Sequence, residues 1–198
     1  MRKLIMWNLM TLDGLFEGTK SWEIDWHEYV WGEELEQLSI DQLKSIDTIL
    51  FGRVTYEGMA SHWPTATGEV ADFMNSMRKL VFSRTMQKAE WNNTRLVKGK
   101  AVDEIVELKR QPGKDMFIFG SADLSSTFMQ HGLIDEFRIC LNPLILGGGN
   151  SLFKPNPKRL KLKLLEARPL KSGCVILRYQ PEGQGTVSLK TDYKTGTR

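Results

Sequence analysis

Residues 47–57, DTILFGRVTYE, contain the transition on which the fold of this chain depends. The first five residues form a short apolar run that is typical of a buried strand. Gly52 ends this run, and residues 53–60 can begin a helix directly after it. A buried strand that passes into a helix is the repeating unit of α/β sheets, so this stretch predicts that class of fold.

Two other apolar runs end in the same way. Phe82 is followed by Ser83-Arg84-Thr85, and Phe119 is followed by Gly120-Ser121-Ala122. Where a strand of an α/β sheet ends and a helix begins, unpaired N–H groups and the positive end of the helix dipole favour a phosphate. Arg53 and Arg84 can add bidentate contacts to a further phosphate. Each transition taken singly is equally consistent with an ordinary turn, but three of them in one chain favour a phosphate site.

Outward from these transitions, the chain alternates between strand and helix patterns. We expect strands at 3–10, 47–51, 79–83, 94–97, 116–119 and 136–146, and a hairpin formed by 160–167 and 174–179. We expect helices at 33–46, 53–60, 101–110 and 125–130, although Ser39 and Asp41 leave open a break in the first. The alternation predicts a three-layer α/β domain with a mixed, mostly parallel sheet and helices on both faces.

Composition narrows the class of protein. The chain has 198 residues, 41% of them hydrophobic, and a net charge of +3, which is too small to indicate a nucleic-acid partner. We expect one domain at 1–181 and a polar tail or ribbon at 182–198. No apolar stretch approaches the ~20 residues that span a bilayer and no signal peptide opens the chain, so we expect a cytoplasmic protein without a membrane partner.

Cys140 and Cys174 lie in apolar runs, which indicates that both are buried thiols, and a disulfide between them is left open.

Several short motifs, in this order and spacing, resemble the dihydrofolate reductase superfamily. The closest resemblance is to the reductase domain of the bifunctional riboflavin-biosynthesis deaminase/reductase and to its stand-alone bacterial relatives. It covers residues 3–180, without the zinc-binding deaminase elements His-x-Glu and Pro-Cys-x-x-Cys. The residues that carry it are Gly52-Arg53-Val54-Thr55-Tyr56-Glu57, Leu12-Asp13-Gly14, Asp25-Trp26, Phe82-Ser83-Arg84-Thr85, Phe119-Gly120-Ser121, Gly132-Leu133-Ile134-Asp135-Glu136 and Pro143-Leu144-Ile145-Leu146-Gly147-Gly148-Gly149.

The resemblance implies NADPH as the cofactor, and it implies which residues would hold it. Gly52, Arg53 and Thr55 would hold phosphates, with Arg53 and Arg84 near the adenosine 2′-phosphate and Ser83 and Thr85 in the same pocket. The pyrophosphate would lie at a helix start formed by Gly120, Ser121, Ala122 and Leu124. Asn8 and Met10, at the end of the first strand, would flank the nicotinamide.

The sequence indicates the residues that would contact the substrate less specifically than those that would hold the cofactor. Trp22 and Trp26 belong to an aromatic cluster, with Tyr29 and Trp31, that fits a substrate lid as well as a core or dimer seam. Gly148 and Gly149 fit either a loop that approaches the substrate or a flexible turn. Asp13 is the favoured catalytic acid over Glu17, Asp25 and Glu28, although an Asp-Gly pair also forms turns.

The expected function is therefore hydride transfer from NADPH to a C=N or C=O carbon of a small planar substrate. The resemblance points to 5-amino-6-(5-phosphoribosylamino)uracil reductase of riboflavin biosynthesis. A non-catalytic NADPH-binding or regulatory module is the alternative. We expect no metal site, because the zincin-like run from His27 has Trp31 where a second ligand would stand. We also expect a homodimer, formed along the C-terminal edge with Phe137, Ile139 and Leu141.

Overall fold

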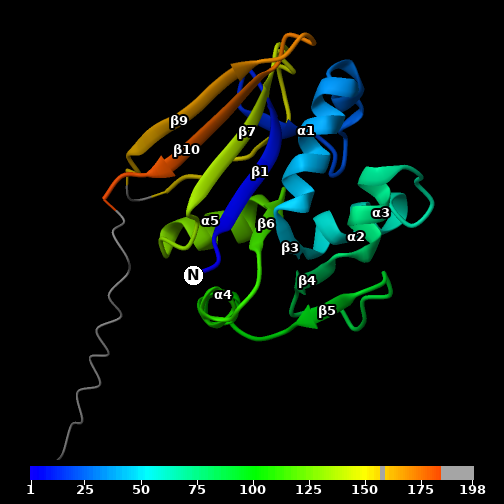
Figure 1. The fold of residues 1–198 in the computed structure, drawn as a ribbon, viewed down its shortest axis with the longest axis vertical. Coiled ribbons are helices and arrows are strands. Elements are labelled where there is room, and N and C mark those ends of the chain that lie inside the picture. Colours follow the sequence, from blue (N-terminus) through cyan, green and yellow to red (C-terminus); the bar gives the residue numbers. More distant parts are fainter. Residues whose placement is uncertain (157–158, 184–198) are drawn as a thin grey trace, which may run out of the picture.

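The computed structural model describes residues 1–156 and 159–183. Within them, an eight-stranded sheet crosses the molecule in the order β5-β4-β3-β6-β1-β7-β10-β9 (Figure 1). The strands from β5 to β7 are parallel, while β10 runs antiparallel to both β7 and β9. The strand bounds are β1 Leu4–Thr11, β3 Ile46–Gly52, β4 Arg78–Phe82, β5 Thr94–Val97, β6 Asp115–Phe119, β7 Glu136–Asn142, β9 Leu162–Pro169 and β10 Val175–Pro181. A separate small sheet pairs β2 (Leu15–Glu17) with β8 (Asn150–Ser151).

Helices cover both faces of the large sheet, which confirms the predicted three-layer α/β fold. One face packs against α1 (Glu33–Lys44), α2 (Arg53–His62) and α3 (Glu69–Ser76), and the other against α4 (Ala101–Arg110) and α5 (Ala122–Gln130). A short 3-10 helix, η1 (Asp25–Tyr29), precedes α1. No helix in the described part of the chain is long and apolar enough to cross a membrane.

The central strands are apolar on both faces, which explains their continuous hydrophobic runs. Along β3, Phe51 points into the core under α1 to α3, whereas Leu50 points into the core under α4 and α5. Both side chains are fully buried. Parallel strands with helices on both sides need this pattern, because neither face of the sheet meets water.

Local details depart from the expected elements in three places. The helix α1 is unbroken, because the Ser39 hydroxyl donates to the carbonyl of Leu35 and stays within the helix. The strand expected at 136–146 is interrupted at Pro143, and β7 ends at Asn142, because proline has no N–H for the ladder. The helix α3 and the small β2–β8 sheet had no counterpart among the expected elements.

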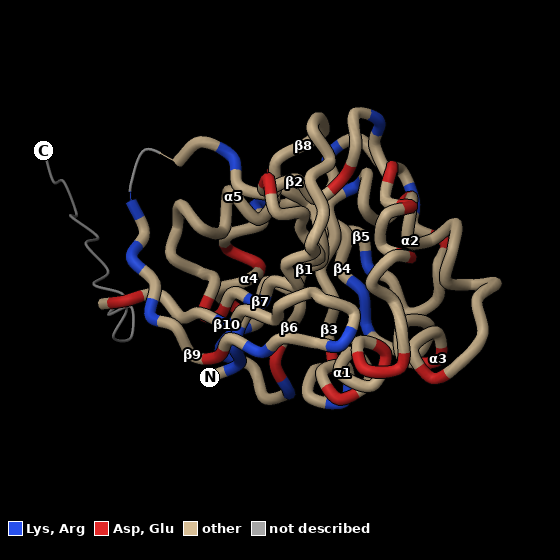
Figure 2. Tube along the Cα trace, turned by 90° about the horizontal axis from the view of Figure 1, so that it is seen from above, with Lys and Arg blue, Asp and Glu red and all other residues tan. Residues whose placement is uncertain are grey.

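The cysteines, the surface charges and the C-terminal tail complete the comparison with the sequence-based expectations. Cys140 and Cys174 are both buried and free, so the disulfide left open above is not formed. Positive and negative residues are interspersed over most elements (Figure 2). The predicted tail at 182–198 lies almost entirely outside the described residues, so the domain boundary stays a prediction.

Candidate functional site

The ends of β3 and β6 meet in a hydrogen-bonded junction. The backbone N–H of Gly52 donates to the Ser121 hydroxyl oxygen at 2.7 Å. That hydroxyl donates to Thr55 Oγ1 at 2.8 Å, and the Ser121 backbone N–H reaches the same oxygen at 3.1 Å. Gly120 and Ser121 both have left-handed backbone angles, with φ of 51° and 54°. The junction therefore fixes the tight turn that leads from β6 into α5.

Asn8, near the end of β1, joins this junction from the neighbouring strand. Its Oδ1 accepts the backbone N–H of Gly120 at 2.5 Å, which fixes the orientation of the side-chain amide. The Nδ2 of Asn8 is buried and has no hydrogen-bond partner. A β-carbon at Gly120 would lie only 3.3 Å from Thr55 Oγ1, so glycine is required here by its contacts as well as by its φ.

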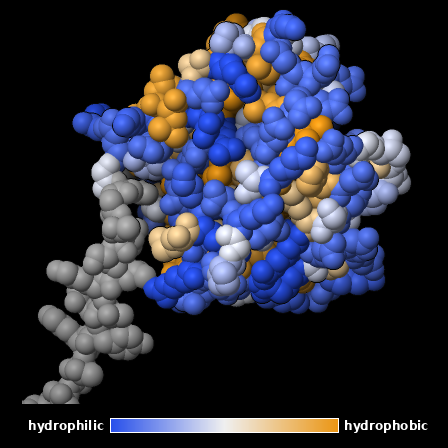
Figure 3. Space-filling view, in the orientation of Figure 1, coloured by the Kyte–Doolittle hydropathy of each residue, from blue (hydrophilic) through white to orange (hydrophobic). Residues whose placement is uncertain are grey.

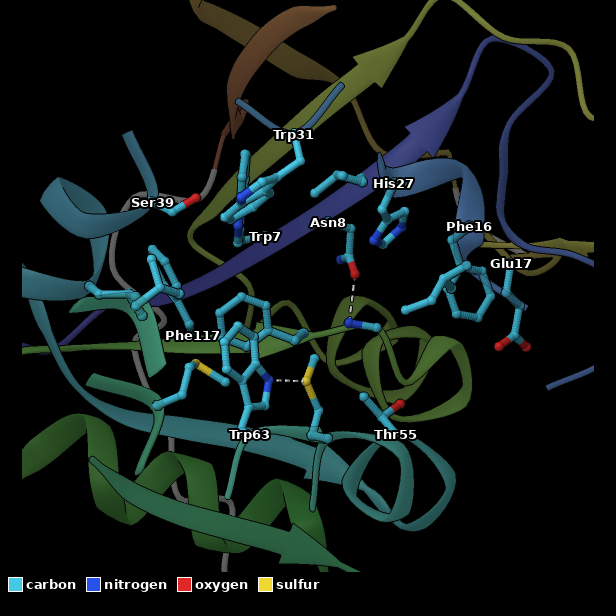
Figure 4. Close-up of a pocket in the computed structure, with 18 of the residues that line it drawn as sticks. Trp7, Asn8, Phe16, Glu17, His27, Trp31, Ser39, Thr55, Trp63 and Phe117 are labelled. Atoms are coloured by element: carbon cyan, nitrogen blue, oxygen red, sulfur yellow. Dashed lines mark hydrogen bonds between the residues drawn. The ribbon is translucent and has the colours of Figure 1, made fainter. Parts of the chain in front are cut away.

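A cavity of about 180 Å³ opens beside the junction. Figure 4 shows aromatic side chains around it. Ser39 and Trp31 lie on one side and Thr55 and Phe16 on the other, with Asn8 and His27 between them. Its ionisable side chains, among the described lining residues, are Glu17 and His27. The full lining is Trp7, Asn8, Leu9, Phe16, Glu17, Trp22, Ile24, His27, Trp31, Ser39, Gln42, Leu43, Thr55, Met59, Trp63, Val70, Met74, Phe117, Phe119 and Gly120.

His27 enters this wall as a neutral side chain. Burial lowers its pKa to about 4, although the nearby Asp25 carboxylate acts in the opposite direction. Its Nε2 is buried without a hydrogen-bond partner, and its ring packs edge-on against Trp26. A neutral imidazole can offer one donor and one acceptor to a ligand.

Glu17 and Trp22 close the cavity from the loop that follows β2. The Glu17 carboxylate accepts the backbone N–H of Trp22 at 2.8 Å and the side-chain amide of Asn150 at 2.9 Å. Trp22 has a φ of 68°, and its indole lies so close to Gly58 of α2 that any β-carbon there would overlap it. We call residues 18–31 the aromatic lid, since Trp22, His27 and Trp31 within it line the cavity.

A second hollow, a groove of about 510 Å³, lies on the α4–α5 side of the same sheet edge. Ser83 and Arg84 contribute from the end of β4, Lys100 from the start of α4, and Leu124 from the first turn of α5. One helical turn thus separates Leu124 in this groove from Gly120 in the cavity. The start of α5 connects the two hollows.

The structure brings most of the sequence-predicted site residues to this edge. Asn8, Thr55, Gly120 and Trp22 line the cavity, and Ser83, Arg84 and Leu124 line the groove. Gly52, Ser121 and Ala122 lie at the junction or directly after it. Thr85 is exposed beside Ser83, and its N–H donates to the Ser83 hydroxyl.

Met10 and Arg53 are placed differently from the sequence-based expectation. Met10 packs into the core under α4 and α5 and does not line the cavity. Arg53 is exposed and forms an ion pair of 3.0 Å with Glu57 one turn further along α2. Neither residue belongs to the walls of the two hollows as they stand.

Three expectations on the substrate side need correction. Trp26 belongs to the aromatic lid, but its side chain is only 2% exposed and does not line the cavity. Gly148 and Gly149 also lie outside the wall; they pack against the loop at 17–19, where a β-carbon at Gly149 would overlap the Glu17 carbonyl. These glycines therefore support the lid from behind.

Asp13 also lies outside the cavity. It accepts hydrogen bonds from the Thr11 hydroxyl at 2.6 Å and from the backbone N–H groups of Leu146 and Gly147 at 3.2 and 2.9 Å. The Thr11 bond and then the Gly147 bond lower the pKa of this carboxyl below its ordinary value, against a small effect of burial. Asp13 is thus an ionised group that ties two loops together, which is the turn-forming alternative.

Two of the residues expected at the dimer interface do not lie at the surface. Phe137 and Ile139 are buried inside the chain, 2% and 4% exposed, and cannot meet a second copy. Leu164 and Leu165 of β9 are instead exposed. Figure 3 shows hydrophobic side chains at the surface on the side of the molecule where β9 lies. Assembly as a homodimer remains a prediction.

Several residues that line the cavity or the groove were not among the site residues expected from the sequence. Lys100 follows Gly99 between the strand at 94–97 and the helix at 101–110, so the strand-to-helix rule applied to the other three transitions would have found it. Trp7 and Trp63 carry no local signal beyond their aromatic rings. Gln42 has none, because its role depends on a contact with Arg138 from a distant strand.

The described residues thus form an α/β domain whose mostly parallel sheet carries a glycine junction, an aromatic cavity and a groove with two cations at its carboxyl edge. The chain belongs to the RibD C-terminal domain family, which matches residues 2–176. It is similar to the Bacillus subtilis (strain 168) protein YyaP, with 34% identity over 187 residues, 92% of this chain and 96% of that one.

Solved structures show the same fold. A candidate riboflavin biosynthesis protein from Shewanella sp. PV-4 has a TM-score of 0.75 at 23% identity, covering 91% of this chain and 99% of its own. Dihydrofolate reductase from Enterococcus faecalis, in a complex with NADP(H), has a TM-score of 0.62 at 14% identity, covering 91% and 96%. The family match confirms the predicted relation to the riboflavin-biosynthesis reductase domain, and these structures confirm the predicted fold.

Proposed function

We propose that this chain is an NADPH-dependent reductase. Its substrate would be a small planar heterocycle or carbonyl compound, reduced in the manner of 5-amino-6-(5-phosphoribosylamino)uracil reductase. One observation carries the proposal: an aromatic cavity and a basic groove open on either side of one glycine junction, with the start of α5 between them. A dinucleotide needs such a path, with a flat pocket at one end, cations at the other and backbone N–H groups between.

The residues at this edge fit the cofactor. At Gly52 and Gly120 a β-carbon would approach the Ser121 and Thr55 hydroxyl oxygens to 3.3 Å, so glycine at both positions keeps the backbone of the junction close-packed and free of side chains of its own. The unpartnered Nδ2 of Asn8 gives a buried donor for a carboxamide oxygen. We assign Asn8, Thr55 and Gly120 to the nicotinamide, and Ser121 with the start of α5 to the pyrophosphate. The bound NADP(H) of the Enterococcus faecalis enzyme, which shares the fold, supports this assignment.

The adenosine end would use the groove. Arg84 and Lys100 supply two cations there, against one carboxylate, Asp103, and charged donors recognise a 2′-phosphate more strongly than a hydroxyl. Arg53, the second arginine expected at this phosphate, is held by Glu57 and would have to leave that ion pair to take part. We therefore assign discrimination between NADPH and NADH to Arg84 and Lys100.

The chemistry that a reduced nicotinamide supplies is transfer of a hydride to the carbon of a C=N or C=O bond. The wall residues would hold the substrate ring against it and exclude water through the aromatic lid. The nitrogen or oxygen of the reduced bond takes up a proton. Since Asp13 lies outside the cavity and the Glu17 carboxylate is occupied as an acceptor by Trp22 and Asn150, we propose that this proton comes from a water molecule.

Cofactor titration tests the proposal. We expect NADPH to quench the tryptophan fluorescence and to bind at least tenfold more tightly than NADH, because one charged hydrogen bond to phosphate contributes about 1.5–3 kcal/mol. Arg84→Ala should remove most of this preference. Arg110→Ala, which removes an equally exposed arginine at the far end of α4, should leave it intact.

Two outcomes would redirect the proposal. Equal affinities for NADPH and NADH would contradict the assigned groove. Tight NADPH binding without oxidation of the cofactor by any pteridine, pyrimidine or carbonyl compound would instead favour a non-catalytic NADPH-binding or regulatory module.

A further inference from the structure

Gln42 places a hydrogen-bond donor at the cavity wall with nothing to receive it. The side chain lies on α1, is 7% exposed and lines the cavity. Its Oε1 accepts an N–H of the Arg138 guanidinium at 3.0 Å, while its Nε2 is buried without a partner. Buried amide groups are nearly always paired, so an unpaired donor beside a cavity indicates that a ligand supplies the acceptor.

The orientation of this amide is fixed by its neighbour. A guanidinium can only donate, so the atom that faces Arg138 must be the oxygen of Gln42. Arg138 is itself held by the Glu136 carboxylate at 2.7 Å and lies over the ring of Phe117, which lines the same cavity. The Nε2 of Gln42 is therefore a fixed donor that cannot turn into an acceptor.

The surrounding wall selects the kind of molecule that can bring that acceptor. Trp7, Trp31, Trp63 and Phe117 provide flat apolar surfaces (Figure 4). The ionisable groups among the described lining residues are a carboxylate, Glu17, and an imidazole that is neutral at pH 7. A phosphate in this cavity would lose its water and meet a negative charge without a cation.

Gln42 also lies on the side of the cavity that the proposed cofactor leaves free. Asn8, Thr55 and Gly120, assigned above to the nicotinamide, belong to the junction side. Ser39, which precedes Gln42 by one turn of α1, lies on the other side in Figure 4. A ligand bonded to Gln42 would therefore take the substrate position.

We infer that the cavity takes an uncharged, planar aromatic or heteroaromatic molecule that bears a carbonyl acceptor and no phosphate, and that Gln42 orients it. Calling this molecule the substrate rests on the proposed function; the binding preference itself does not. The inferred ligand differs from a phosphoribosyl-bearing uracil because it carries no phosphate, which is the group that the cavity excludes. Gln42 becomes a specificity-determining residue, and Arg138 a positioning residue that acts through it.

Calorimetric binding of three probes to the whole chain tests the inference. Phthalimide is flat and neutral with two carbonyl acceptors, indane has a similar bicyclic frame without acceptors, and 1-naphthyl phosphate carries the excluded group. We expect phthalimide to bind at least tenfold more tightly than indane, and 1-naphthyl phosphate to bind more weakly than either.

Gln42→Glu separates the donor from the structural contact. The carboxylate keeps an acceptor for Arg138 but has no N–H, so we expect at least a tenfold loss of phthalimide affinity per folded molecule, with indane affinity unchanged. Burial of the new charge should also lower the thermal midpoint, so both affinities are measured below the melting transition. Gln37→Glu makes the same chemical change on the exposed face of α1 and should alter neither affinity.

The inference is overturned if phthalimide does not bind, if it binds no better than indane, if 1-naphthyl phosphate binds at least as tightly as phthalimide, or if Gln42→Glu leaves phthalimide affinity unchanged. NADPH titration of the same proteins keeps the two proposals apart. NADPH binding without the phthalimide preference would reject the ligand class alone. The phthalimide preference without NADPH binding would reject the cofactor and leave the cavity assignment standing.

Discussion

Gly120→Val should damage cofactor binding more than it damages the fold. Valine at a φ of 51° costs about 1–2 kcal/mol, because L side chains clash in the left-handed region. Its β-carbon would lie 3.3 Å from Thr55 Oγ1 and 3.4 Å from Thr55 Cγ2, so its methyl groups must displace the Thr55 side chain. This displacement lowers the free energy of unfolding by about 1–3 kcal/mol in addition to the backbone cost. We expect a total near 3 kcal/mol, which lowers the thermal midpoint by about 6–12 °C.

The affinity effect should be much larger than this loss of stability. Thr55 accepts both bonds from Ser121, so moving it opens the junction that presents the start of α5. We expect the NADPH dissociation constant, corrected for the folded fraction, to rise more than tenfold. Fluorescence titration below the melting transition measures it, and calorimetry measures the midpoint.

Gly173→Ala provides the matched control. Gly173 also has a positive φ, 88°, but it lies in the β9–β10 turn, where a β-carbon meets only an ordinary contact with Pro143 at 3.4 Å. This variant should lose about 1–2 kcal/mol of stability and no cofactor affinity. If Gly120→Val lowers the midpoint as expected and still binds NADPH with wild-type affinity, this junction does not contact the phosphates and the reasoning fails.

Three other predictions follow from the lid and the surface. Burial lowers the pKa of His27 to about 4, whereas an unfolded histidine titrates near 6.5. As pH falls the unfolded chain therefore binds the proton first, and urea unfolding should show about 2 kcal/mol of stability lost between pH 7 and pH 5; a His27→Gln protein that loses just as much would refute this. Gly58→Ala should displace the Trp22 indole and speed proteolysis within the lid, while Gly32→Ala, whose β-carbon meets nothing, should not; equal cleavage rates would contradict the packing described. Light scattering at micromolar concentration should give the mass of a homodimer, and a monomeric mass would count against it.

The sheet could be predicted from sequence because its strands are short apolar runs that end at glycine or serine. Residues 47–57 place β3 and the start of α2 within one residue of where they lie. The same local pattern placed Gly52, Ser83 and Ser121 at one edge of the sheet, where the structure has them. Their contact with phosphates stays a prediction.

The substrate side could not be predicted, because it depends on contacts between distant segments. Trp22 and Trp26 look alike in sequence, but Trp22 lines the cavity while Trp26 fills the core. The sequence favours Asp13 over Glu17 as the catalytic acid, but the structure places Asp13 outside the cavity, bonded to the loop at 146–147, and Glu17 in the cavity wall. Gln42 reads as a surface glutamine on an amphipathic helix until Arg138 fixes its amide.

The position of β1 sets the order in which this protein can assemble. Although it is the first strand of the chain, β1 lies between β6 and β7, and it pairs with β6 over residues 4–7 and with β7 over residues 5–11. During synthesis at about 5–20 residues per second, β1 must wait on the order of ten seconds for those partners to emerge. Until then its apolar side chains are exposed to solvent, and such late, long-range pairing makes folding slow. A nascent chain arrested before β7 should therefore engage a chaperone, even though it already contains every residue that lines the cavity.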